Sequence, residues 1–180
     1  MGKLIGSRYA SSLFDAGLEL GKVDKFYEEL ELINTHFNQE DKLFQIFIHP
    51  RISKDEKKSM VKEIFGNNVS NELLNFLYII IDKTRERNLF AISEEYKRIY
   101  DEHKGIVDVE AVTAIPMGKN AINKLQGVLE NKLNKKIRIS NKIDKSIIGG
   151  VLLKMKDKVI DNTLVSQLKS MEDLINKISL

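Results

Sequence analysis

The sequence predicts a two-domain α+β protein, with an N-terminal six-helix bundle over residues 1–105 and a small α/β domain over residues 106–180. Apolar residues recur at helical spacing through the first hundred positions, and near Gly105 the pattern changes to the alternation of a β-strand. The charge balance changes at the same place. Residues 1–104 carry 16 Lys and Arg against 18 Asp and Glu, whereas residues 105–180 carry 13 against 8. Such a split indicates two domains with different partners.

The first three helices of the bundle are predicted from apolar residues at three- and four-residue spacing. These stripes cover residues 4–20, 23–37 and 43–48. The third helix must end before Pro50, because the residue that precedes a proline avoids helical geometry.

The next three helices have clearer start signals. Ser53 and Glu56 have the spacing of a capping box, and the fourth helix runs from there to Phe65. Ser70 is predicted to cap the fifth helix, which is apolar nearly all round and is therefore expected at the centre of the bundle. The sixth helix covers residues 90–104.

The second domain alternates between strand and helix patterns. We predict a strand over residues 107–115, a helix over 122–133, a strand over 136–140, a third strand-like run over 147–155 with a short return at 159–160, and a terminal helix over 164–178. The pair Gly149-Gly150 leads into an apolar strand and not into a helix, so it is not a phosphate-binding loop. We expect a close backbone approach or a bulge there.

Composition limits the compartment and the chemistry. The chain contains no cysteine, which excludes disulfides, thiol nucleophiles and Cys-zinc sites. No apolar run approaches the roughly 20 residues of a transmembrane helix. The N-terminus also lacks the pattern of a secretory or transit peptide, so the cytoplasm is the expected compartment.

No group of residues has the spacing of an active site. The three histidines, His36, His49 and His103, do not have metal-ligand spacing, and no nucleotide-binding or nucleophile motif occurs. We expect five helical carboxylates to face water and not to form a catalytic pair: Glu28, Glu29, Glu31, Asp55 and Glu56. The sequence therefore predicts no catalytic residue, no cofactor and no metal.

A basic stretch in the second domain leaves an alternative function open. It consists of Lys132, Lys135, Lys136, Arg138, Lys142 and Lys145. Lysine clusters attract phosphate, so the alternative function is a basic adaptor that binds nucleic acid through this domain. Residues 105–180 contain no Phe, Tyr or Trp on which bases could stack. A solvated face, or one matched to an acidic protein partner, is the favoured interpretation.

Two helices have faces that could receive another helix. In the terminal helix, Leu164, Leu168, Met171, Ile175 and Ile178 are spaced 4-3-4-3, which is the pattern of a coiled-coil seam. In the first helix, small residues form a stripe: Ala10, Ser11, Ser12 and Ala16. Each face could pack inside its own domain or against a partner.

Several segments together resemble one known family. The first is residues 8–16, with the pattern Arg-Tyr-Ala-x-x-Leu-Phe-x-Ala. Shorter ones are His49-Pro50 before the capped helix and Arg85 after the fifth helix. The most specific are residues 143–151 and 159–163, which are followed by Leu168. The chain resembles, over essentially its whole length, the delta subunit of bacterial F-type ATP synthase. The mitochondrial counterpart of that subunit is the oligomycin-sensitivity-conferring protein.

The resemblance implies a non-catalytic stator protein, monomeric on its own. In that family the helical domain binds N-terminal segments of the alpha subunits on the catalytic head, and the second domain binds the b subunits of the peripheral stalk. The protein would lie on the cytoplasmic face of the bacterial membrane as a peripheral membrane protein, with membrane association only through the complex. The implied alpha-subunit contacts are Tyr9, Ser12, Ala16, Phe76, Ile79 and Lys83. The candidate stalk contacts are Leu164, Leu168, Met171 and Ile175.

Overall fold

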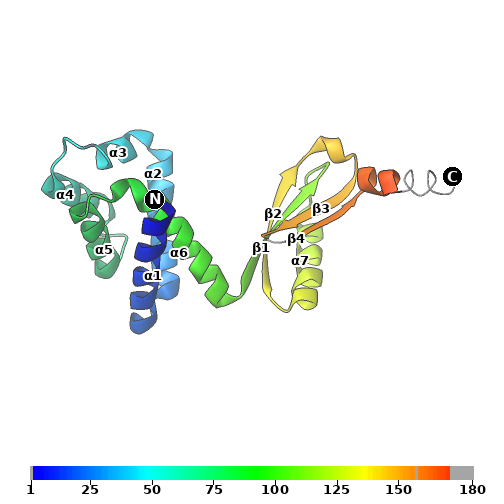
Figure 1. The fold of residues 1–180 in the computed structure, drawn as a ribbon, viewed down its shortest axis with the longest axis horizontal. Helices are drawn as coiled ribbons and strands as arrows, with labels where there is room; N and C mark the ends of the chain where they lie inside the picture. The colour runs from blue at the N-terminus through cyan, green and yellow to red at the C-terminus, as the bar shows by residue number, and fades with distance from the viewer. Residues whose placement is uncertain (1, 157, 171–180) are drawn as a thin grey trace. The chain divides into compact units, whose positions relative to one another are not determined.

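The computed structural model describes residues 2–156 and 158–170 of the 180-residue chain. Helices and a β-sheet both occur, so the predicted α+β class is confirmed (Figure 1). The chain divides into two compact units, Met1–Asp101 and Glu102–Leu180.

The first unit is helical. Its elements are α1 (Gly2–Leu20), α2 (Val23–Gln39), α3 (Asp41–Phe47), α4 (Lys54–Phe65), α5 (Asn71–Asp82), the 3-10 turn η1 (Glu86–Asn88) and α6 (Leu89–Lys104), whose last residues lie beyond the unit boundary. One buried cluster joins these helices, and each contributes to it, for example through Leu13, Phe26, Phe47, Val61, Leu77 and Ile92. Burial of these apolar side chains is the main force that holds the helices together.

The predicted capping box starts α4. The hydroxyl oxygen of Ser53 accepts a hydrogen bond from the backbone N–H of Glu56 at 3.2 Å. In return, the Glu56 carboxylate accepts one from the backbone N–H of Ser53 at 2.9 Å. These bonds lower the pKa of Glu56, with the backbone bond as the larger cause.

The start of α5 differs from the prediction. Ser70 occupies the N-cap position, but its side chain makes no capping bond to its own helix. Its hydroxyl instead donates to Glu29 Oε2 and its backbone N–H donates to Glu29 Oε1, both at 2.7 Å. The prediction that Glu29 faces water was wrong, because this carboxylate is buried and ties α2 to the start of α5. Helical spacing alone could not reveal a partner that lies 41 residues away.

Most of the apolar residues of α5, the helix predicted at the centre of the bundle, are buried. Leu73, Leu77, Ile80 and Ile81 are fully buried. Ile79 is the exception, with 49% of its surface exposed. The helix therefore keeps one apolar side chain at the surface of the unit.

The second unit contains a mixed sheet. Its elements are β1 (Ile106–Thr113), α7 (Lys119–Leu133), β2 (Lys136–Ile143), the 3-10 turn η2 (Lys145–Ile147), β3 (Gly150–Met155) and β4 (Lys158–Thr163), followed by helical residues 164–170. Among the described residues the strand order is β2-β1-β3-β4, with β1 parallel to β2 and the other pairs antiparallel. Leu129 of α7 packs with Val109, Ile137 and Leu153 of the sheet.

Three strands of this sheet differ from the sequence prediction. The second strand, predicted over 136–140, continues to Ile143. The third strand begins at Gly150 and not at Ile147, because residues 145–147 form η2. The short return predicted at 159–160 is a full strand, β4, which pairs with β3 from Lys158 to Thr163. Asp161 and Asn162 have low strand propensity, but the ladder with β3 provides the hydrogen bonds that outweigh it.

The close backbone approach predicted at the glycine pair is confirmed. Gly150 has a φ of +82°, and a Cβ on it would overlap the carbonyl oxygen of Asn162 and lie 2.9 Å from the Cα of Thr163. Glycine is needed there both for the backbone conformation and for the space.

Candidate partner-binding groove

A groove runs between α1 and α5 on the surface of the helical unit. It has a volume of about 410 Å³ and is lined by Leu4, Ile5, Arg8, Tyr9, Ser12, Phe76, Ile79 and Arg85. The structure thus brings together Tyr9, Ser12, Phe76 and Ile79 of the candidate alpha-subunit contacts. The lining does not include Ala16 or Lys83.

Close helix packing places α1 beside α5 and α6. A Cβ on Gly6 would lie only 2.9 Å from the backbone oxygen of Ala91 in α6, so this glycine allows α1 to approach closely. The rings of Tyr9 and Phe76 pack edge to face, with centroids 6.4 Å apart. The buried face of α1 carries Ala10 and Leu13, which leaves the opposite row of residues on the groove.

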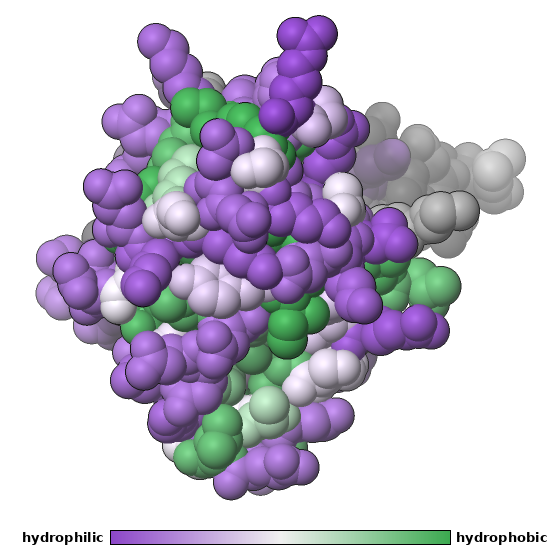
Figure 2. All heavy atoms as spheres, turned by 90° about the vertical axis from the view of Figure 1, so that its left-hand side faces the viewer, coloured by the Kyte–Doolittle hydropathy of each residue, from purple (hydrophilic) through white to green (hydrophobic). Residues whose placement is uncertain are grey.

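Large apolar side chains are exposed along this groove. Leu4 is 72% exposed and Ile79 is 49% exposed. Figure 2 shows that one face of the helical unit is largely hydrophilic, with groups of hydrophobic side chains between the polar ones. Adjacent exposed apolar residues around a hollow are typical of a site that binds a partner. An apolar groove between two helices can receive an amphipathic helix.

Sequence reasoning missed half of the groove lining. Leu4 was predicted to belong to a core-facing stripe, but it is mostly exposed. Arg8 and Leu4 lie four and eight residues before Ser12, so the helical period would have placed them on the same row. Arg85 follows the end of α5, and only the folded turn brings it to the groove.

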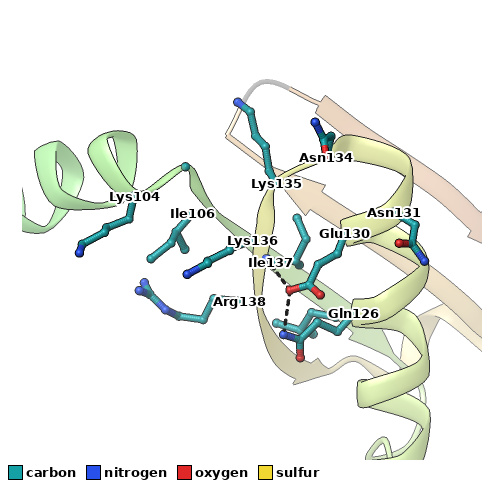
Figure 3. Close-up of a pocket in the computed structure, with 12 residues that line it drawn as sticks. Lys104, Ile106, Gln126, Glu130, Asn131, Asn134, Lys135, Lys136, Ile137 and Arg138 are labelled. Carbon is teal, nitrogen blue, oxygen red and sulfur yellow. Dashed lines mark hydrogen bonds between the residues drawn. The ribbon is translucent and has the colours of Figure 1, made fainter.

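The second unit has a wide basic pocket between α7 and β2 (Figure 3). It has a volume of about 1040 Å³, and its lining includes Lys104, Lys135, Lys136 and Arg138. Glu130 lies among them and accepts hydrogen bonds from the backbone N–H of Ile137 at 3.1 Å and from Gln126 Nε2 at 3.2 Å. The backbone bond is the larger cause of a lowered pKa of Glu130, so this carboxylate stays charged.

The basic stretch of the second unit is partly neutralised. The guanidinium of Arg138 lies 3.0 Å from the carboxylate of Asp108 on the neighbouring strand. Lys142 lies 3.9 Å from the carboxylate of Glu110. Because these charges are compensated across the sheet, the face is mixed in sign.

The helical residues 164–170 carry exposed aliphatic side chains. Leu164 is 45% exposed and Leu168 is 61% exposed, whereas Met171 and Ile175 lie outside the described residues. The helix start is fixed by Asp161, whose carboxylate accepts hydrogen bonds from Ser166 Oγ at 2.6 Å and from the backbone N–H of Thr163 at 2.9 Å. These bonds, the serine's first, lower the pKa of Asp161.

No helix in residues 2–156 or 158–170 combines the length and hydropathy that crossing a membrane requires. In the same residues, no cluster of three or more His, Asp or Glu side chains could hold a metal ion.

The fold and the groove define the class: an α+β protein with an apolar groove that suits a helical protein partner. The chain belongs to the ATP synthase delta (OSCP) subunit family, whose model matches residues 5–175. The expectation drawn from the segments around Arg8 and Gly150 is thereby confirmed. The nucleic-acid alternative receives no support from this family.

Individual relatives agree with the family assignment. The chain is 42% identical to ATP synthase subunit delta of Alkaliphilus oremlandii over 178 residues, which cover 99% of each chain. It is 35% identical to the subunit of the same name from Clostridioides difficile, with 97% of each chain covered. Its fold is similar to a chain in the Toxoplasma gondii mitochondrial ATP synthase hexamer, with a TM-score of 0.71 at 18% identity, covering 94% of this chain and 96% of that one.

Proposed function

We propose that this chain is a stator subunit of an F-type ATP synthase, which links the alpha subunits of the catalytic head to the b subunits of the peripheral stalk. Such a link would keep the head from turning with the rotor, so that ion flow is coupled to ATP synthesis. The observation that carries the proposal is the apolar groove between α1 and α5, in a chain that belongs to this family.

The helical unit would act as the six-helix bundle that binds the catalytic head. An amphipathic N-terminal segment of an alpha subunit would place its apolar side chains against Tyr9, Phe76 and Ile79. Ser12 would allow close approach of that segment. Ala16 and Lys83 each lie four residues beyond a groove residue, so they would extend the contact along the same helical rows.

The second unit would bind the end of the stalk. Leu164 and Leu168 are exposed aliphatic residues on one helical row, and the sequence continues that row through Met171 and Ile175. The terminal segment would thus form the amphipathic helix that receives the b subunits. The mixed charges on β1 and β2 would suit a stalk end that carries both signs.

The remaining properties follow from this role. The chain would be non-catalytic, with neither cofactor nor metal, and monomeric before assembly. It would lie on the cytoplasmic face of the bacterial membrane and associate with that membrane only through the complex.

Isothermal titration calorimetry of the full chain with a synthetic N-terminal peptide of the alpha subunit tests the proposal. Ile79→Asp should weaken binding at least about tenfold, because it places a charge against the apolar wall of the groove. The matched control is Ile46→Asp on α3, since Ile46 is 45% exposed and lies outside the groove. No binding by the folded wild-type chain, or equal losses in both variants, would contradict the groove assignment.

A further inference from the structure

We propose that the groove between α1 and α5 selects a helix that carries an acidic side chain, which Arg8 and Arg85 bind together. This inference rests on the proposed function, because it assumes that the groove receives a helical segment. It goes further by assigning a charge to the partner and a specificity role to two arginines.

The charged residues that line the groove are all positive. Two of its residues, Arg8 and Arg85, are cationic, and none is acidic. Both arginines are exposed, and neither forms an ion pair with any side chain that the structure describes. They border an apolar wall, so a partner that covers this wall brings its own side chains close to both guanidinium groups. A carboxylate is the complementary group, because a planar guanidinium can bind both of its oxygens.

The turn after α5 fixes the backbone of Arg85. The N–H of Arg85 donates to the carbonyl of Ile80 at 2.9 Å, and the N–H of Thr84 donates to that of Ile81 at 3.0 Å. Thr84 has a φ of +54°. These features define a Schellman motif with Thr84 in the left-handed position that glycine usually occupies. This motif therefore fixes the direction in which the backbone leaves α5 at Arg85.

Helix α4 forms ion pairs with residues before and after this turn. Before the turn, the ammonium group of Lys58 lies 2.6 Å from the Asp82 carboxylate. After it, Lys57 forms a buried ion pair with Glu86 at 2.7 Å. Arg85 therefore starts from a backbone that is held three residues before it and one residue after it. Less conformational entropy is lost when such a side chain binds than when it projects from a loose loop.

The other arginine projects from the groove side of α1. Arg8 lies one helical turn from Leu4 and from Ser12, which also line the groove. The hydroxyl of Ser12 donates to the backbone carbonyl of Arg8 at 3.0 Å, so this serine is already satisfied within its helix. Among the α1 residues that line the groove, Arg8 is the cationic one, so its guanidinium group can form an ion pair with a carboxylate of the partner.

The test uses the full chain and the alpha-subunit N-terminal peptide in calorimetric titrations at low and high salt. Arg8→Gln and Arg85→Gln should each raise the dissociation constant about three- to tenfold at low salt and flatten its salt dependence. Arg87→Gln is the control, because it removes the same charge from an exposed residue of η1 that does not line the groove. It should bind like the wild-type chain. Arg85→Lys should recover part of the loss, since it restores the charge without the planar group.

Peptides in which each acidic residue is replaced by its amide complete a double-mutant cycle. The amide that removes the bound carboxylate should weaken binding to the wild-type chain and have little further effect on Arg85→Gln. Wild-type affinity in both arginine variants, an equal loss in Arg87→Gln, or tight binding of a peptide without acidic residues would overturn the inference. Absence of any peptide binding to the wild-type chain would instead overturn the proposed function. Circular dichroism confirms that each variant is folded.

Discussion

The ammonium nitrogen of Lys57 in α4 lies 2.7 Å from Oε1 of Glu86 in η1, and both side chains are almost fully buried, with 6% and 5% of their surfaces exposed. The removal of only one charge of such a buried pair is destabilising, because it leaves the other charge uncompensated in the interior. The pair joins two segments that are 29 residues apart in sequence.

Lys57→Met should therefore destabilise the chain by about 3 kcal/mol, because it strands the carboxylate of Glu86 in the interior. Urea unfolding followed by circular dichroism measures this loss. The double variant Lys57→Met, Glu86→Leu should regain most of it, since neither charge then remains buried. If the double variant is as unstable as the single one, the loss of stability comes from altered packing and not from the uncompensated charge.

The hydrogen bonds from Ser70 to Glu29 predict a second effect on stability. Ser70→Ala removes the hydroxyl that donates to the buried carboxylate and should cost about 1–2 kcal/mol. Ser11→Ala, at an exposed position of α1, is a suitable control and should be near neutral. The midpoint of urea unfolding distinguishes the two variants. Equal midpoints would mean that the bond from the Ser70 backbone is sufficient to hold Glu29.

Tyr100 predicts a loss of stability at alkaline pH. Burial, and then the hydrogen bond to Asp24, raise the pKa of Tyr100 to about 12 in the folded chain. The unfolded value is about 10. The folded state therefore favours the protonated phenol, and this contribution is fully present below pH 10 and is lost as the pH rises towards 12. Tyr100→Phe should show a shallower fall in unfolding free energy over that window, measured by urea titration at each pH.

The glycine pair predicts unequal effects of two neighbouring substitutions. Gly150→Ala should destabilise the second unit by about 2 kcal/mol or more, because it combines a strained φ with an overlap against the Asn162 carbonyl. Gly149→Ala should cost less, because its Cβ would meet a side-chain carbon of Leu164, which can move. Amide hydrogen exchange in β3 and β4 reports the local loss. Equal exchange rates in the two variants would contradict this account.

Much of this protein follows from its sequence. The helical period of the first hundred residues, the Ser53–Glu56 capping box and the alternation after Gly105 predict the class and most elements, because these signals are local. The segments near Arg8 and Gly150 also predict the family, because they resemble its pattern. Four groove residues could be predicted because the family resemblance paired the first helix with the fifth.

Only the tertiary structure decided how distant residues meet. The partner of Ser70 is Glu29, the partner of Lys57 is Glu86, and β4 becomes a full strand because β3 provides its ladder. Arg85 reaches the groove because a turn with Thr84 at positive φ redirects the chain. Periodicity reports which face of an element is apolar, but it cannot report what that face or a buried charge touches. Those contacts depend on packing between segments that are far apart in the sequence.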